Sequence, residues 1–389
     1  MAKKMLFLFV LLLSLTGMLK AQVTTAGMSG KVMADEESVI GATVVAVHEP
    51  SGTSYGTVTN VDGRFSLQGM RSGGPYKVTV SYIGYQTAIY TGIQLQLGET
   101  YSLNVTLHEA SELLGEITIT ASKSKFSAEK TGATTNISSE QLTTLPSINR
   151  SISDFTRISP YASGNSFGGR DGRSNTFTVD GANLNNNFGL SSGLPGGGNP
   201  ISLDAIDEVQ VVIAPYDVRQ ANFIGAGINA ITKSGTNAYR GSAYMYFNNE
   251  VMRGNKIGDT DFGARAEESK TVYGATFGGP IIKDKLFFFA NVEYEKSPQQ
   301  VITWRAAKEG EDPNNSTISR TTEADLAEFS QILKDKYGYN TGSFTDFPAD
   351  VTNLKLLGRI DWNINQGNKL SVRYNFTNNK TWEPPNGSS

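Results

Sequence analysis

The final third of the chain contains long segments in which apolar and polar side chains alternate. Three of them are Leu286 to Glu295, Leu354 to Trp362, and Leu370 to Phe376. Alternation places one kind of side chain on each face of a strand, and strands of roughly ten such residues are typical of transmembrane β-barrels. A water-soluble β-sandwich would also alternate, so the spacing of the segments has to be considered as well.

The connections between these segments are long and short in turn. A long polar loop joins the segments near Tyr239 to Phe247 and Lys270 to Phe277, and Gly278 to Lys285 forms a short turn. A very long excursion from Lys296 to Thr352 follows, and Gln366-Gly367 gives the next tight turn. Long external loops alternating with short periplasmic turns favour an outer-membrane barrel.

The residues after Gly235 leave room for about five strands, whereas plugged outer-membrane barrels close with about 22. We therefore expect residues 236–389 to be the N-terminal part of a barrel, with its remaining strands downstream of Ser389. The long excursion contains one amphipathic helix candidate, Thr322 to Tyr337. An open barrel edge would invite aggregation in isolation.

The N-terminus has the layout of a secretory signal peptide. Lys3 and Lys4 precede the apolar run Met5 to Leu13, and the segment closes before Gln22, so that we expect cleavage after Ala21. The apolar run is too short to cross a bilayer as a helix, which needs about 20 residues. The chain is therefore expected to be exported.

Composition excludes several classes of function. The net charge of −3 gives no electrostatic footprint for nucleic acid. Without cysteine there is no disulfide framework and no thiolate metal site. The two histidines, His48 and His108, have no neighbouring ligands for zinc, and we expect ordinary surface or rim histidines. No nucleophile elbow is present. We predict no enzymatic activity, no metal and no cofactor.

A small β-sandwich is expected after the signal peptide, over residues 22–108. Asp62-Gly63 supplies turn chemistry for a hairpin that would join Thr57 to Asn60 with Arg64 to Leu67. The strand candidates are Ser29 to Met33, Ala42 to His48, Ser54 to Thr59, Arg64 to Leu67, Tyr76 to Tyr82 and Tyr101 to Leu107.

Three motifs in this region, Gly41 to Val44, Thr59 to Phe65 and Val80 to Tyr85, together resemble the carboxypeptidase-regulatory-like domain. That resemblance implies a prealbumin-like β-sandwich, acting as an accessory binding or spacer module without peptidase activity.

Residues 131–235 carry the motifs of a second domain with mixed α+β structure. Ser138 and Gln141 form a capping box for a short helix that Pro146 stops, and a second short helix is expected near Ile152 to Ile158. Asn175 to Gly181 is a strand that ends in an Asp-Gly turn. The glycines at 168–172 are not a phosphate loop, because no helix and no Gly-Lys-Ser/Thr follow them.

Within Ile201 to Thr236, Val209 to Ala214 reads as a strand buried on both faces, and Gly225 and Gly227 would let backbones approach closely. Together with Thr176 to Gly181 and Gly278 to Phe289, this region closely resembles the plug domain of Oar-like TonB-dependent receptors. The match spans more than a hundred residues in family order. A plugged outer-membrane barrel is what the resemblance implies.

The linker at residues 109–130 offers an exposed strand, Glu116-Ile117-Thr118-Ile119-Thr120, before a Lys/Ser-rich stretch. It resembles the TonB box that precedes the plug, which implies that a TonB-type energy-transducing protein binds it by strand addition. The other reading is simply the first strand of the plug.

A loop from Ala182 to Pro200 is rich in Asn, Gly and Ser. By family resemblance it would lie near the plug apex, where substrate is first met. We therefore regard Asn185, Asn186, Asn187 and Phe188 as candidate substrate-binding residues; an uncommitted linker is the alternative.

The sequence thus predicts a mainly β chain, with a sandwich, a plug and the first barrel strands in the outer membrane of a Gram-negative bacterium. The sandwich and plug would lie on the periplasmic side. The function implied is energy-coupled passage of a substrate, whether peptide, glycan or siderophore. The alternative is a cell-surface carbohydrate-binding or adhesion protein without transport.

Overall fold

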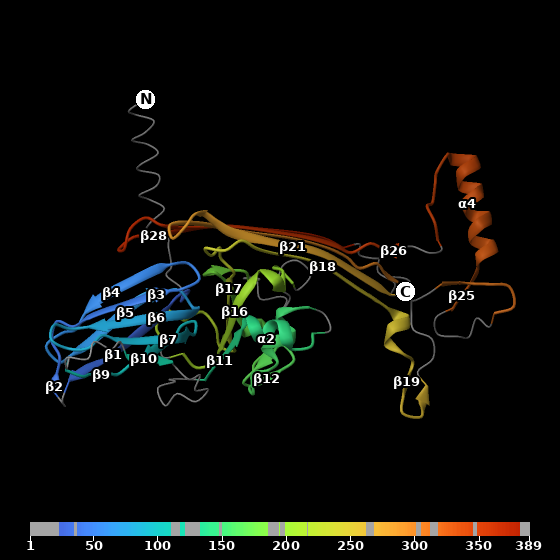
Figure 1. Ribbon diagram of the computed structural model, residues 1–389. Coiled ribbons are helices and arrows are strands. Elements are labelled where there is room, and N and C mark those ends of the chain that lie inside the picture. Colours follow the sequence, from blue (N-terminus) through green and yellow to red (C-terminus); the bar gives the residue numbers. More distant parts are fainter. Residues whose placement is uncertain are drawn as a thin grey trace, which may run out of the picture. The chain divides into compact units, whose positions relative to one another are not determined.

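The computed structural model is mainly β (Figure 1). It describes residues 23–34, 37–109, 117–120, 133–147, 150–185, 194, 199–215, 217–261, 268–300, 305–311, 318–344 and 348–381. The expected signal peptide, Glu116 and the linker after Thr120 lie outside these residues. The chain divides into two compact units: one comprises residues 1–241, 276–291 and 357–375, and the other comprises the segments between and after them.

The N-terminal domain of the first unit is a sandwich of two sheets. One sheet is centred on β1 (Ala26–Ala34), which pairs with β2 (Glu37–Ser38), β5 (Arg64–Met70), β8 (Thr100–Ser102) and β9 (Val105–Leu107). The other has the order β10-β7-β6-β3-β4, with β10 at Ile117–Thr120, β7 at Ala88–Leu95, β6 at Gly73–Ser81, β3 at Thr43–His48 and β4 at Thr53–Val58.

Both sheets of the sandwich contribute to one core. Alternate side chains of each strand point inward, and Met28, Val44, Val78 and Ile93 are all at most 1% exposed. Burial of these apolar side chains is the main stabilising contribution to a small domain of this kind.

Two strand predictions for the sandwich need correction. Asp62-Gly63 does form a turn, with the Gly63 N–H donating to Asn60 O at 2.9 Å, but β4 and β5 on either side of it belong to different sheets. The predicted hairpin is therefore wrong, because turn chemistry is local and does not choose the partner strand. The strand β7 was not predicted, since Gly92 interrupts its alternation.

The domain that was predicted to be the plug, called the plug domain below, is built on a five-stranded sheet of order β11-β16-β17-β14-β15. The capping box of Ser138 and Gln141 is confirmed, and it starts α2. The elements are β11 (Thr134–Ser138), α2 (Ser139–Thr144), α3 (Ile152–Thr156), β12 (Ala162–Ser163), β13 (Ser166–Phe167), η1 (Gly172–Ser174), β14 (Thr176–Val179), β15 (Ala182–Asn183), η2 (Leu203–Ala205), β16 (Ile206–Val212) and β17 (Gly227–Thr232).

Close packing in the plug requires glycine at two positions. A Cβ on Gly227 would lie 2.7 Å from the Phe223 ring, and one on Gly225 would lie 2.3 Å from Asn175 Oδ1. The prediction of close approach is confirmed, although the nearest atoms at both positions belong to side chains.

Five long strands form a sheet of order β18-β21-β22-β27-β28. Their bounds are β18 (Arg240–Asn249), β21 (Ser269–Ile282), β22 (Leu286–Lys296), β27 (Thr352–Asn363) and β28 (Lys369–Lys380). The predicted alternation is confirmed on β22 and β27: Asn291, Glu293 and Asp361 are at most 5% exposed, whereas Tyr294 and Trp362 are 41% and 46% exposed. One side is therefore polar and covered, and the other is apolar and open.

The connections of these strands contain the remaining elements. The predicted helix is present as α4, which Thr322 caps and the left-handed Gly338 ends. The elements in these connections are η3 (Glu250–Arg253), β19 (Lys256–Ile257), β20 (Thr260–Asp261), β23 (Gln299–Gln300), β24 (Arg305–Ala307), β25 (Ile318–Thr322), α4 (Glu323–Tyr337) and β26 (Pro348–Ala349). No helix in the described ranges is long and apolar enough to cross a membrane.

Candidate functional site

The exposed strand predicted in the linker, Glu116 to Thr120, is called the coupling segment below. Its residues Ile117–Thr120 are described in the structure and form β10. Its backbone pairs in parallel with β7, in the register Ile117 with Ala88 and Thr120 with Thr91. Because β10 ends the sheet order, one main-chain edge of β10 faces no further strand of that sheet among the residues that the structure describes. The segment is thus an extended edge strand of the sandwich, and the alternative reading as the first strand of the plug sheet is wrong.

A cluster of buried charges joins the plug to the polar side of the long strands. Asp180 accepts hydrogen bonds from Thr232, through Oδ1 from its N–H at 3.0 Å and through Oδ2 from its hydroxyl at 2.6 Å. Arg373 Nε lies 3.5 Å from Asp180 Oδ2, and Arg359 Nη1 lies 3.9 Å from Oδ1. Arg359 also donates to Asp361 at 2.7 Å. The plug is therefore bound to β27 and β28 by ion pairs that are largely shielded from water.

The second unit has its own polar cluster on the covered side of its strands. Lys355, only 1% exposed, donates to Glu293 Oε1 at 2.8 Å and lies 3.7 Å from Glu295 Oε2. The Tyr244 hydroxyl donates to Glu293 Oε2 at 2.8 Å. Buried charges of this kind persist only when they are paired, and here each carboxylate has a cation or hydroxyl partner.

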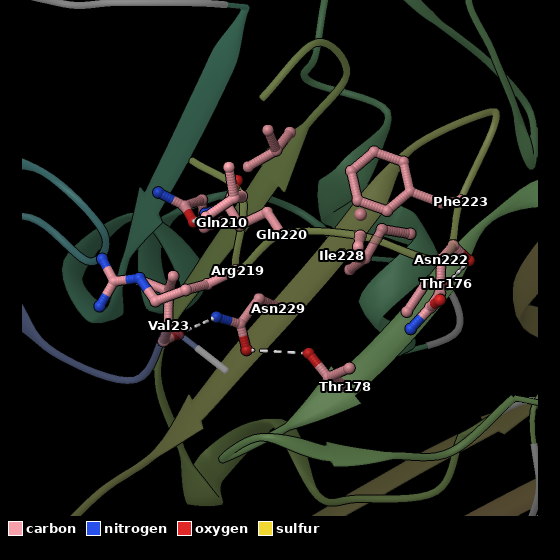
Figure 2. A pocket seen from close by; sticks show the side chains of 14 residues that line it. Val23, Thr176, Thr178, Gln210, Arg219, Gln220, Asn222, Phe223, Ile228 and Asn229 are labelled. Atoms are coloured by element: carbon pink, nitrogen blue, oxygen red, sulfur yellow. Dashed lines mark hydrogen bonds between the residues drawn. The ribbon is translucent and has the colours of Figure 1, made fainter. Parts of the chain in front are cut away.

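The plug also walls a cavity of about 330 Å³ beside β16 and β17 (Figure 2). Its polar side chains are held by bonds to their neighbours. The Thr178 hydroxyl donates to Asn229 Oδ1 at 2.9 Å, and Gln220 Nε2 donates to Gln210 Oε1 at 3.2 Å. Asn229 in turn donates through Nδ2 to the carbonyl of Val23, just before β1. One wall of the cavity thus ties the sandwich to the plug.

Glu208, which lies on β16, is an unusual residue for a buried strand. It is 7% exposed, and its two carboxylate oxygens accept from the Leu97 N–H at 3.0 and 3.2 Å. Burial raises the pKa of Glu208 to about 8, the Leu97 N–H opposes this shift, and the nearby negative charges of Asp207 and Glu99 add to it. This carboxyl is therefore poised to titrate near neutral pH.

The candidate substrate-binding loop is described only in part. Asn186, Asn187 and Phe188 lie outside the described residues. The side chain of Asn185 accepts from the Phe177 N–H at 2.6 Å and donates to Asn175 O at 3.0 Å. Its amide therefore supports the start of β14, and contact with a substrate would require these bonds to be exchanged.

The prediction for the histidines is half wrong. His108 is exposed, but His48 is only 5% exposed, and its Nδ1 lies 2.7 Å from Ser51 Oγ. Burial lowers the pKa of His48 to about 3, and the positive charge of Arg71 acts in the same direction. His48 is thus a neutral core residue. In the described part of the chain, no three His, Asp or Glu side chains are grouped to hold a metal ion.

The sequence analysis did not identify several of these residues as candidates for the site. Glu208 and Gln210 interrupt an apolar run at positions 206–212, and this is the signal that could have marked a contact with another domain. The pairing of Asp180 with Arg359 and Arg373 joins residues more than 170 positions apart, for which a single sequence carries no signal.

Two family models match this chain. Residues 27–108 match the carboxypeptidase regulatory-like domain, and residues 231–389 match the outer membrane beta barrel domain. Among curated proteins, the TonB-dependent transporter Oar of Myxococcus xanthus is 25% identical over 343 residues, which are 83% of this chain and 30% of that protein. The chain therefore spans less than a third of the length of this relative.

Solved structures that match part of this chain include two receptors. The siderophore receptor PirA from Acinetobacter baumannii matches with a TM-score of 0.43 and 20% identity, over 64% of this chain and 32% of the receptor. The ferric enterobactin receptor PfeA from Pseudomonas aeruginosa, a Q482A mutant in complex with enterobactin, matches with a TM-score of 0.43 and 14% identity, over 65% and 34% of the respective chains.

Proposed function

We propose that this chain belongs to a TonB-dependent outer-membrane receptor of the Oar type, and that the full-length protein carries a substrate across the outer membrane with energy delivered from the periplasmic side. In this proposal residues 1–21 are removed, residues 22–108 form the accessory sandwich, and residues 109–130 hold the coupling segment. Residues 131–235 form the plug, and residues 236–389 begin the barrel.

The observation that carries the proposal is the attachment of the plug to the polar side of β27 and β28. Asp180 shares its carboxylate between Thr232 of the plug sheet and the guanidinium groups of Arg359 and Arg373. A substrate can pass a plug held in this way only if these contacts are broken or exchanged. Separating buried charges from their partners is costly, and this cost is what the energy delivered from the periplasmic side would offset.

Energy would enter through the segment Glu116 to Thr120. The edge position of β10 supports this role, because an extended strand with an open edge can add to the sheet of a partner through main-chain hydrogen bonds. The partner would be a TonB-type protein, with the sandwich and the plug facing the periplasm. The substrate class stays open between peptide, glycan and siderophore, and Asn185 to Phe188 remain candidates for its first contact.

Deletion of residues 116–121 in the full-length protein tests this function. We expect uptake to be lost while surface binding of the substrate is retained, since the coupling segment lies outside the plug. Unchanged uptake would contradict energy coupling through this segment. Binding without any uptake in the unmodified protein would favour a carbohydrate-binding or adhesion role instead.

A further inference from the structure

The sandwich contacts the plug through the main chain of the loop between β7 and β8. Besides the Leu97 N–H, which binds Glu208, the Leu97 carbonyl accepts from Nε2 of Gln210 and from Nδ2 of Asn136, the latter at 3.4 Å. Both backbone groups of one fully buried residue are thus bonded by plug side chains from β11 and β16. Buried backbone groups must be paired, and here the plug provides their partners.

The loop approaches the plug so closely that its glycine cannot be replaced freely. Gly98 has a φ of +71°, and a Cβ at this position would lie 2.9 Å from Gln210 Nε2 and 3.2 Å from Val23 Cγ1. Gly92 provides a comparison in the same domain. It has a similar φ of +77°, but a Cβ there would meet nothing within 4 Å.

Further contacts hold the sandwich through residues outside this loop. The Asn237 N–H donates to Pro50 O at 2.8 Å, and Asn363 Nδ2 donates to Thr53 Oγ1 at 2.9 Å. Arg71 Nη2 also lies 3.6 Å from Asp361 Oδ2. These contacts involve the chain just after the plug and the end of β27, so the docking does not depend on a single loop.

We propose that the carboxypeptidase-regulatory-like sandwich is a docking module for the plug, with residues 96–99 as its binding loop and Asn136, Glu208 and Gln210 as the receiving surface. This inference extends beyond the proposed transport and needs neither the substrate nor the energy-transducing partner. A consequence is that β11 and β16 of the plug sheet cannot move without breaking their contacts to the sandwich.

The contact should respond to pH in a defined direction. Burial raises the pKa of Glu208 to about 8 from the 4.5 of a free carboxyl, and the loop contributes to this shift by covering the carboxyl and by the negative charge of Glu99, so docking favours the protonated form. The charged groups that face Glu208 are Asp207 on its own strand and Glu99 on the loop. Docking should therefore be strongest at acid pH and weaken by up to about tenfold per pH unit as the pH rises from about 5 to 8.

Chemical cross-linking tests the docking in the full-length receptor, freed of any cysteine outside these residues. Gln96→Cys is combined with Asn136→Cys, because Gln96 Oε1 and Asn136 Nδ2 are 3.3 Å apart. A short bis-maleimide is added, the linker is then cut at a protease site inserted after Ser122, and gel mobility shows whether the sandwich stays attached. The control pair places one cysteine at Val61, which is 74% exposed on a turn of the sandwich, with Asn136→Cys.

We expect efficient cross-linking of the 96/136 pair and at least tenfold less of the 61/136 pair. Equal yields for the two pairs would overturn the proposal.

The matched glycines give a second test with the same readout. Gly98→Ala and Gly92→Ala impose similar backbone strain, so a general loss of sandwich stability would affect both variants alike. If the loop docks as described, Gly98→Ala lowers the 96/136 yield several-fold and Gly92→Ala does not. Equal losses would mean that the loop does not contact the plug.

Glu208→Gln separates docking from its pH dependence, because the amide oxygen still accepts from Leu97 but cannot titrate. Its cross-linking yield should stay nearly constant between pH 5 and 8, while that of the unmodified surface falls. A fall of the same size in both would refute the role of this carboxyl.

Discussion

Asp180 is the residue at which the plug and the long strands are joined. Its φ of +48° places it in the left-handed region, where it begins the turn into Gly181, and its carboxylate is then directed at Thr232, Arg359 and Arg373. Asparagine and aspartate tolerate this backbone region better than other residues with a side chain. The same residue therefore makes the turn and provides the charge.

Asp180→Asn should weaken the plug while keeping its turn. The asparagine can still accept from the Thr232 N–H, but two partly buried guanidinium groups lose one anionic partner. We expect the free energy of plug unfolding to fall by on the order of 2 kcal/mol. Hydrogen exchange of β14 and β17 in urea measures it. Asp171→Asn, which removes an exposed ion pair with Arg173, should have no measurable effect; an equal effect of both variants would argue against the cluster.

His48 should make the sandwich sensitive to acid. Its pKa is about 3 in the fold and 6.5 when free, so stability is complete above pH 6.5 and is lost as the pH falls toward 3. The expected loss is at most about 1.4 kcal/mol per pH unit. Hydrogen exchange of β3 and β6 should show a shallower pH dependence in His48→Gln. His108→Gln, at an exposed site, should keep the original dependence, and a change in both would contradict this origin.

At the scale of elements, the pairing of β10 with β7 has a direct consequence for coupling. If another protein must take Ile117–Thr120, this strand has to leave the sandwich edge. A Thr91→Cys and Thr120→Cys pair places two thiols at Cα partners in adjacent strands, a separation that a disulfide can bridge. In the full-length receptor without other cysteines, oxidation should stop uptake and a reductant should restore it, with surface binding unchanged.

Thr120→Cys alone is the control for this experiment, and it should remain active under oxidising conditions. Uptake that persists with the disulfide formed would show that β10 does not need to leave β7.

Elements with local signals were predicted well from the sequence. The capping box at Ser138 correctly started α2, because a cap and its partner lie within one helical turn, and the amphipathic candidate from Thr322 to Tyr337 correctly located α4. The alternation of β22 and β27 correctly predicted which side chains are covered and which are exposed, because neighbouring residues of a strand point to opposite faces. The assignment of strands to sheets could not be predicted from local signals. The Asn60–Gly63 turn was expected to pair β4 with β5, but β4 pairs with β3 and β5 pairs with β1, and the two sheets bury their side chains in one core.

The candidate site was predicted less completely, since its contacts join distant parts of the chain. The coupling segment was identified by its position and its β-branched residues, but the parallel partner β7 could not be inferred from those residues. Gln210 lies in the segment Val209 to Ala214 that was expected to be an apolar strand buried on both faces, and Glu208 directly precedes that segment. The bonds of both side chains to the Leu97 backbone explain why polar residues are buried at these positions.

At the scale of the whole molecule, the open apolar side of the long strands distinguishes a membrane receptor from a soluble protein. Ile360 and Trp362 are 47% and 46% exposed on β27, with Asp361 buried between them on the opposite side. In a water-soluble sheet an exposed apolar residue can be replaced by a charged one at little cost. In a bilayer the same replacement is unfavourable.

Ile360→Arg should therefore impair assembly of the full-length receptor in lipid vesicles. The expected cost is about 2–4 kcal/mol if the residue lies near the bilayer midplane, and less near an interface. Val218→Arg is the control, because Val218 is 93% exposed in the plug and should tolerate the charge. Folded yield and urea midpoint are compared in vesicles for both variants. If Ile360→Arg assembles as well as Val218→Arg, the open side of β27 faces water rather than lipid, and the outer-membrane assignment of these strands fails.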